Sequence, residues 1–373
     1  MGTANKIPNL FTAKPLFGLD IGRSSLKIVQ LSHQATKIKK NDKHKGARYP
    51  LPHVISYGST DFDPAAIEDG VVVQPELIAQ AAKQLFEKRL IGDVTSRRVA
   101  LTIPSYRSFT RSIQLPLMDD HEMEEAVRLE AEQYIPVPLD DLYLDYTLLS
   151  KDKNGLEVLA VAVPRNIVDS YLELCAIIGL EPVLIETSSS SVARLISHDD
   201  QSDVPTIIID FGSVSSDISI YDGGLVTSGT VEGGGADFTK AIQEGLSVTS
   251  AEAGIIKTKY GLSRSKRQSE IQDALDPVLQ KIIKEIKRLV RYHSERYGAD
   301  RPITQVITLG GGANMPGLSE YFTSSLRLAV RSCDPWLYVD YQRLQPPSAA
   351  DRTMYATAIG LALAPETEVF KND

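Results

Sequence analysis

Two short segments of the sequence combine aspartate, glycine and serine in the same order. The first reads Asp20-Ile-Gly-Arg-Ser-Ser and the second Asp210-Phe-Gly-Ser-Val-Ser. A glycine in a tight turn lets backbone N–H groups approach a ligand, and successive N–H groups in such turns form a concavity that binds anions. Serine hydroxyls add donors, and a carboxylate at a strand end suits a hydrated Mg²⁺. Together the segments predict a site for phosphate groups and magnesium.

Each segment lies at the tip of a predicted β-hairpin, covering 16–31 in the first case and 206–221 in the second. In both, an apolar strand ends at the aspartate, a glycine-containing turn follows, and an alternating strand returns. One such turn alone usually just reverses the chain, so the pairing carries the prediction. The internal repeat indicates two related lobes. On the first returning strand, Lys27 would place its ammonium over the outer phosphates.

A third glycine-rich segment strengthens this prediction. Residues 305–309 read as a buried strand that ends in Gly310-Gly311-Gly312, and a helix is expected to follow. Three glycines at a strand end allow a flat ring to lie against bare backbone, and a helix N-terminus favours anionic groups. Alone, the segment would be a flexible turn. With the two hairpins, it is expected to hold an adenosine.

The sequence between these segments alternates strand and helix patterns, which indicates an α/β protein. Strand patterns occupy residues 98–104, 142–149 and 157–163. Helical spacing occupies residues 76–90, 119–135 and 167–178, with Asp119 as a capping residue. The longest helix is expected to open at Asp276-Pro277 and to close at Gly298.

Composition excludes several classes of protein. No apolar stretch approaches the ~20 residues that span a bilayer, and no apolar leader is recognisable near the start. Cys175 and Cys333 lie in apolar contexts and read as reduced core residues, which favours the cytoplasm. The net charge of −8 argues against nucleic acid as a partner. The basic stretch 37–48, inside an insertion at 34–52, reads as a solvated loop or a contact for anionic lipid.

In this order and spacing, the two Asp-Gly loops and the late Leu-Gly-Gly-Gly loop resemble the actin, Hsp70 and sugar kinase superfamily. The resemblance implies a two-lobed, actin-like (ribonuclease H-like) fold that binds ATP and Mg²⁺, with Asp20 and Asp210 near the metal. The nucleotide-binding residues that it implies in the three loops are Asp20, Gly22, Arg23, Ser24, Ser25, Lys27, Asp210, Gly212, Ser213, Gly310, Gly311 and Gly312.

The same resemblance implies further roles. Residues 184–193 are similar to the first connection between the lobes, which makes Glu186 the candidate general base; its alternative role is an acid stabilised at a helix N-terminus. Residues 251–261 are similar to the segment that contacts ribose and base, and Lys257 falls in place there. Gly254 stands where an acid is common, so ribose recognition is weaker or shifted to Glu252.

A second resemblance narrows the family. Residues 123–139, from Met-Glu-Glu-Ala-Val-Arg to Ile-Pro-Val-Pro-Leu, closely resemble the signature of PilM proteins, actin-like components of the type IV pilus inner-membrane platform. Taken alone, this helix is amphipathic, acidic and capped, which fits any domain interface. The resemblance implies an inserted subdomain at 105–180, shared with FtsA. The first lobe would comprise 1–104, 181–204 and 350–373, and the second lobe 205–349.

The expected function is therefore that of an ATP-binding scaffold in type IV pilus assembly. It would dock the N-terminal cytoplasmic segment of a bitopic, PilN-like membrane protein, together with other platform components. These partners would hold a cytoplasmic protein at the inner membrane. The resemblance leaves slow ATP hydrolysis and self-association open.

Two alternatives belong to other classes. An FtsA-like, filament-forming ATPase usually carries a C-terminal amphipathic anchor, whereas this sequence ends in the short acidic segment 364–373. A small-molecule kinase would need a catalytic aspartate in a substrate cleft. Asp145 and Asp169 are available for that role, but neither lies in a recognisable motif.

Overall fold

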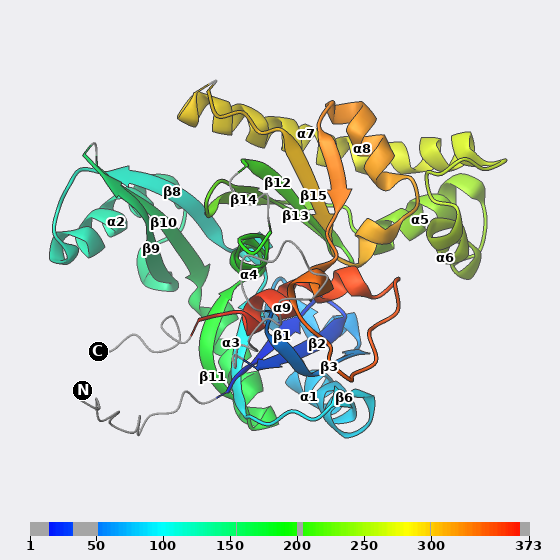
Figure 1. Ribbon diagram of the computed structural model, residues 1–373, viewed down its shortest axis with the longest axis horizontal. Helices are drawn as coiled ribbons and strands as arrows, with labels where there is room; N and C mark the ends of the chain where they lie inside the picture. Colours follow the sequence, from blue (N-terminus) through cyan, green and yellow to red (C-terminus); the bar gives the residue numbers. More distant parts are fainter. Residues whose placement is uncertain (1–14, 33–50, 154, 200–203, 299, 366–373) are drawn as a thin grey trace, which may run out of the picture.

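The computed structural model describes residues 15–32, 51–153, 155–199, 204–298 and 300–365. The basic stretch 37–48 and residues 366–373 lie outside this part of the chain. The described residues form two α/β lobes on either side of a cavity, with a smaller unit beside them (Figure 1). The two-lobed α/β architecture expected from the repeated hairpins is confirmed. No helix in the described ranges combines the length and apolar character needed to cross a bilayer.

The first lobe is built on a mixed sheet, in which β1 pairs antiparallel with β2 and parallel with β7. Its strands, in spatial order, are β11 (Glu181–Thr187), β7 (Arg98–Ile103), β1 (Phe17–Ile21), β2 (Ser25–Ser32), β3 (His53–Asp61) and β6 (Ile91–Gly92). Leu26 and Ile28 of β2 face a core completed by α1 (Pro75–Gln84) and α3 (Arg165–Ile178). On the same strand, Val29 and Leu31 face α4 (Ser188–Ile196) and α9 (Ala356–Ala362). This period of two covers both faces of the sheet with helices.

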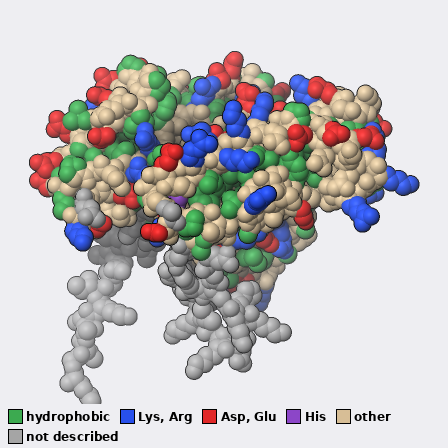
Figure 2. Space-filling view, turned by 90° about the horizontal axis from the view of Figure 1, so that it is seen from above, with side chains coloured by type: hydrophobic (Ala, Val, Ile, Leu, Met, Phe, Trp, Pro, Cys, Tyr) green, Lys and Arg blue, Asp and Glu red, His purple; other side chains and the backbone are tan. Residues whose placement is uncertain are grey.

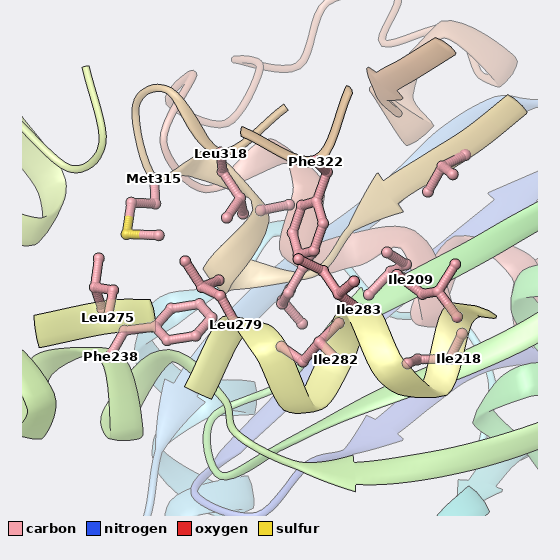
Figure 3. Close-up of a cluster of buried hydrophobic side chains, with 14 of the residues drawn as sticks. Ile209, Ile218, Phe238, Leu275, Leu279, Ile282, Ile283, Met315, Leu318 and Phe322 are labelled. Carbon is pink, nitrogen blue, oxygen red and sulfur yellow. The ribbon is translucent and has the colours of Figure 1, made fainter. Parts of the chain in front are cut away.

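The second lobe repeats the hairpin and adds a parallel strand beside it. In spatial order, its sheet contains β16 (Ala329–Ser332), β15 (Gln305–Leu309), β12 (Thr206–Phe211), β13 (Ser215–Tyr221) and β14 (Leu225–Glu232). The helices of this lobe are α5 (Gly235–Leu246), α6 (Ser250–Lys259), α7 (Gln268–Tyr297) and α8 (Leu318–Leu326). Figure 3 shows Leu279 and Ile283 of α7 packed toward Ile209, Phe238 and Phe322. Each such fully buried side chain contributes about 1.5–3 kcal/mol, so this core fixes the strand ends above it.

Helix α7 begins earlier than the sequence pattern predicted. It opens at Gln268 and not at Asp276, which places Pro277 inside the helix. Proline cannot donate the hydrogen bond to the carbonyl four residues earlier, here that of Asp273. Both residues lie on the exposed face, so water can replace this bond. The apolar face runs unbroken through Ile271, Leu275 and Leu279. Burial of this apolar face stabilises the helix by more than the missing hydrogen bond of the exposed proline costs.

The inserted subdomain continues the sheet of the second lobe. Its strands β8 (Phe109–Leu115), β10 (Gly155–Pro164) and β9 (Leu142–Asp152) follow β14 in that order, giving one eight-stranded sheet within the described residues. Helix α2 (Asp120–Tyr134) covers it, burying Met123 and Val127 against β8 and β10. The expected cap is present: the Asp119 side chain accepts a hydrogen bond of 3.0 Å from the backbone N–H of Glu122.

This subdomain joins the second lobe at the edge of β14 and near the end of α7. Strand β8 pairs with β14 at Arg111 and Thr227, and the Thr227 hydroxyl donates to the Thr110 carbonyl at 3.1 Å. Near the end of α7, the Tyr297 hydroxyl donates to Glu157 of β10 at 2.5 Å. The inserted subdomain therefore contacts the second lobe through a short strand pairing and through Glu157, which also forms an ion pair with Arg296 at 3.4 Å.

Helix α3 packs differently from the expectation for residues 105–180. Ile167, Tyr171 and Leu174 belong to the core of the first lobe, together with strands β1, β2 and β7. The layers of the subdomain itself end with β10. After β10, the chain therefore re-enters the first lobe through α3. This helix lies between that lobe and the inserted strands.

The outer side of α2 is acidic. Its glutamates Glu122, Glu124, Glu125 and Glu132 are exposed, with Arg128 among them. In Figure 2, several acidic side chains lie at the left end of the molecule, where Figure 1 places this subdomain. The surface of the inserted subdomain therefore favours a positively charged neighbour.

Candidate functional site

A cavity of about 460 Å³ lies between the lobes at the ends of β1 and β12. Its lining includes every residue that the sequence analysis assigned to the three glycine-containing loops, and also Lys257. They converge because β1 and β12 occupy matching places in their sheets, each followed by an antiparallel hairpin partner. The volume falls in the range of sites for small ligands and cofactors.

Asp20, at the end of β1, is held by two neighbours. Its Oδ2 receives the Lys27 Nζ at 2.9 Å, and its Oδ1 accepts a hydrogen bond from Thr102 at 3.2 Å. The register places Lys27 directly opposite Asp20 across the hairpin. In this structure the ammonium thus pairs with the carboxylate, and it stands beside the loop where phosphates were expected.

Asp210 occupies the matching place at the end of β12. Burial raises its pKa to about 7, and the negative charges of Asp217 and Asp20 act in the same direction. Asp217 lies opposite Asp210 on β13. Its pKa is also raised by burial, against the hydrogen bonds from Thr230 at 2.6 Å and Ser188 at 3.1 Å. Both raised pKa values mean that Asp210 and Asp217 are easily protonated here, and a bound cation would favour their ionised forms.

Gly310 has no room for a side chain. Its φ of +83° is unfavourable for other residues, and a Cβ there would lie 2.2 Å from Asp210 Oδ1 and 2.6 Å from the Phe211 carbonyl oxygen. The glycine thus lets β15 close against the loop after β12. Gly312 contributes to the same close approach, since a Cβ there would lie 2.8 Å from the Phe211 Cβ.

We expect Gly310→Ala to destabilise the protein by about 2–4 kcal/mol, because a positive φ coincides with clashes against the Asp210 carboxylate and the Phe211 carbonyl. The matched control is Gly311→Ala, where no atom of the described residues lies within 4 Å of the added Cβ. This variant should change stability by less than about 0.5 kcal/mol. Urea denaturation followed by circular dichroism measures both. Equal stabilities of the two variants would contradict this assignment.

Lys257 of α6 reaches the cavity from the second lobe. Its Nζ donates to the carbonyl oxygen of Gly235 at 2.8 Å, at the start of α5, and burial lowers its pKa. Neighbouring Glu252 instead caps its own helix, bonding to the backbone N–H of Thr249 at 2.9 Å. Glu252 does not line the cavity in the described structure.

The structure does not bring Glu186 to the cavity. It lies on β11, at the edge of the first-lobe sheet, and its two oxygens bind the Arg194 guanidinium at 2.5 and 2.7 Å. A paired carboxylate of this kind supports the connection between β11 and α4, and it is not placed as a base. Asp145 and Asp169, the aspartates considered for a kinase, are exposed on β9 and α3 and also do not line the cavity.

The family model for type IV pilus assembly protein PilM matches residues 18–365, nearly the whole chain. The chain belongs to the PilM family. A solved PilM–PilN type IV pilus biogenesis complex contains a chain with 26% sequence identity, a TM-score of 0.76, and coverage of 93% of this chain and 97% of that one. The expectation drawn from the segment 123–139 is confirmed.

Two more distant structures share the fold of this PilM-family chain. The ethanolamine utilization protein EutJ from Carboxydothermus hydrogenoformans has 18% identity and a TM-score of 0.54, covering 95% of this chain and 91% of its own. MreB5 of Spiroplasma citri, solved with AMPPNP, has 14% identity and a TM-score of 0.52, with 96% of each chain covered. Both similarities show the fold alone, and they confirm the actin-like architecture.

Several residues that line the cavity of this PilM-family chain were absent from the sequence prediction. They are hydroxyl and carboxyl groups on elements outside the three loops, or just past them: Thr102, Tyr106, Tyr171, Ser188, Asp217, Thr353 and Thr357. Asp217 had a usable signal, since a hairpin that reverses after Gly212 pairs it with Asp210. The others come from separate elements, and their sequence context carries no comparable pattern.

Proposed function

We propose that this PilM-family protein binds ATP with Mg²⁺ between its lobes and docks the N-terminal cytoplasmic segment of a PilN-like bitopic membrane protein. One observation carries the nucleotide part: the residues predicted from three separate loops converge on one cavity. In this proposal, the two hairpin turns hold the phosphates. Gly310 to Gly312 and Lys257 lie beside the adenosine.

The charges in the cavity fit a magnesium ion. Asp20, Asp210 and Asp217 line the cavity together with Arg23, Lys27 and Lys257, and burial raises the pKa of Asp210 to about 7. A divalent cation beside Asp20 and Asp210 would favour the ionised form of Asp210. Within the described ranges, no group of three or more His, Cys, Asp or Glu side chains is arranged to hold a metal. Mg²⁺ prefers few carboxylates together with waters and nucleotide phosphates, so it would arrive with ATP. It would neutralise the charge of the phosphates there.

We propose that ATP turnover is slow. Among the described residues that line the cavity, the carboxylates are Asp20, Asp210 and Asp217. Asp20 and Asp210 are assigned to the metal, and Asp217 already accepts two hydrogen bonds. With Glu186 bound to Arg194, no dedicated general base remains in this set. ATP then acts mainly as a bound ligand that bridges the lobes.

Thermal unfolding tests the nucleotide proposal. We expect millimolar ATP with Mg²⁺ to raise the Tm by several degrees, since a ligand at 100 times its Kd stabilises the folded state by about 2.7 kcal/mol. GTP and ATP with excess EDTA serve as comparisons. An unchanged Tm at all ATP concentrations would refute nucleotide binding.

The similarity to a PilM chain in complex with PilN supports the partner. For the docking surface, we propose the open edge of β9 and the adjoining side of α3. Within the described residues, β9 pairs with β10 alone, so its other edge can add a strand. Tyr143 of β9 bonds to Asp169 of α3 at 3.0 Å, and its ring packs under Arg165. Tyr143 and Leu172 remain 41% and 37% exposed, which offers apolar contacts.

The acidic face of α2 fits the same partner. Segments on the cytoplasmic side of a transmembrane helix are enriched in lysine and arginine. The exposed glutamates of α2 would attract such residues. In this proposal, the inserted subdomain is the docking module, the two lobes form the nucleotide module, and the partner holds the protein at the inner membrane.

A further inference from the structure

The cavity continues beyond the phosphate loops into the first lobe. Tyr106 lines it from the single helical turn Ser105–Arg107 that follows β7, and Tyr171 lines it from α3. Apolar side chains of Ile67, Ile103 and Pro104 complete this end. Apolar walls strengthen hydrogen bonds to a charged ligand, because they reduce the screening by water.

Tyr171 is the least satisfied group at this end. Its side chain is fully buried, and its hydroxyl makes no hydrogen bond to any described residue. Burial raises its pKa, and the nearby Tyr106 and Asp20 act in the same direction, so the hydroxyl stays protonated and can donate. A buried donor without a partner is unfavourable, and this one borders a cavity. It therefore points to an acceptor on a ligand.

Arg23 supplies positive charge in the same place. It lies at the tip of the first phosphate loop and lines the cavity. Burial raises the pKa of Tyr106, while the charge of Arg23 and its hydrogen bond to the Tyr106 hydroxyl lower it. The guanidinium and the two phenols thus gather around one end of the cavity, next to Asp20.

We propose that Tyr171, together with Arg23 and Tyr106, recognises the terminal phosphate of ATP and thereby distinguishes ATP from ADP. This inference rests on the proposed nucleotide site and adds a specificity-determining residue to it. The γ-phosphate carries the acceptor oxygens and the negative charge that a donor and a guanidinium match. ADP ends one phosphate earlier and leaves Tyr171 without a partner. Because α3 also borders β9, the residue that reads the terminal phosphate sits on the helix that faces the partner.

The test compares Tyr171→Phe with Tyr134→Phe. Tyr134 of α2 also has a buried hydroxyl without a partner in the described residues, but it does not line the cavity. Isothermal titration with the non-hydrolysable analogue AMPPNP and with ADP, each with Mg²⁺, gives two dissociation constants per protein. For Tyr171→Phe we expect the Kd for AMPPNP to rise about tenfold or more, and the Kd for ADP to change less than about twofold. Tyr134→Phe should change neither.

Thermal unfolding without nucleotide completes the test. Removing an unpartnered hydroxyl should leave the Tm of Tyr171→Phe unchanged or raise it. A lower Tm with equal losses for AMPPNP and ADP would show a structural role and overturn the inference, as would unchanged discrimination between the two nucleotides. If the unaltered protein binds neither nucleotide, the proposed function itself fails, and this result is distinct from the others.

Discussion

Replacing Asp210 by asparagine is expected to abolish Mg²⁺-dependent ATP binding and, at the same time, to stabilise the nucleotide-free protein at pH 8. The two effects have one cause. Burial and the neighbouring carboxylates raise the pKa of Asp210 to about 7 from an ordinary value of 3.8, so its ionised form is unfavourable when no cation is bound beside it. Asparagine keeps the shape and removes the charge. It therefore removes both the proposed metal ligand and the repulsion.

The pH dependence follows from the direction of this shift. Because the folded state holds the proton more tightly than the unfolded state, the stability associated with Asp210 is full below about pH 4 and is lost as the pH rises to about 7. A difference of about three pKa units sets an upper limit of about 4 kcal/mol. We expect about 1–3 kcal/mol for Asp210→Asn at pH 8, and almost nothing at pH 4.

Thermal unfolding at pH 4 and pH 8, with and without MgATP, measures these effects. Asp145→Asn is the matched control, since Asp145 is exposed on β9 and does not line the cavity. It should leave the pH dependence and the ATP effect intact. Circular dichroism follows the loss of backbone structure in each variant. If Asp210→Asn lowers the Tm at pH 8, the electrostatic account of this cavity is incorrect.

The second large effect concerns the partner. We expect the double change Tyr143→Ala and Leu172→Asp to weaken binding of a synthetic peptide by at least about thirtyfold, or about 2 kcal/mol. The peptide carries the N-terminal cytoplasmic residues of the PilN-like protein from the same organism. An exposed aromatic residue at a strand edge is a typical binding anchor, and an aspartate in an apolar contact loses its hydration.

The matched control carries the same two changes on the other lobe. Tyr260→Ala and Ile255→Asp alter residues of similar type that are 40% and 59% exposed on or next to α6. Fluorescence anisotropy of the labelled peptide compares the variants. Equal losses in both would place docking elsewhere or show a general effect on stability. A full loss in the β9–α3 variant alone supports the proposed surface.

Local patterns predicted much of the fold. Both hairpins, the Asp119 cap and the glycine-terminated strand β15 follow from residues close together in sequence, and such signals survive without tertiary information. The start of α7 did not follow, because Asp276-Pro277 is also the ordinary signal for a helix beginning. Ile271 and Leu275, four residues apart and both buried, would have indicated the earlier start of this helix.

The site was predictable where backbone turns create it and unpredictable where tertiary packing does. The loop residues line the cavity as expected, since their positions follow from the turns themselves. Glu186 does not, because α4 folds back and presents Arg194 to it, eight residues along the chain. Tyr106 and Tyr171 belong to different elements that meet only in the folded protein. Proximity between residues of such distant elements leaves no pattern in a single sequence.

The attachment of the inserted subdomain has a thermodynamic consequence. Its chain enters and leaves through the first lobe, while β8 is hydrogen-bonded to β14 and Glu157 to Tyr297 in the second. Any rotation of the lobes must therefore shear one of these joints or carry the subdomain along. In the proposed function, a peptide that stiffens the seam between β9 and α3 would change the free energy of that rotation, as would a nucleotide that bridges the lobes. Linkage makes the effect reciprocal: the factor by which the peptide alters nucleotide affinity equals the factor by which the nucleotide alters peptide affinity.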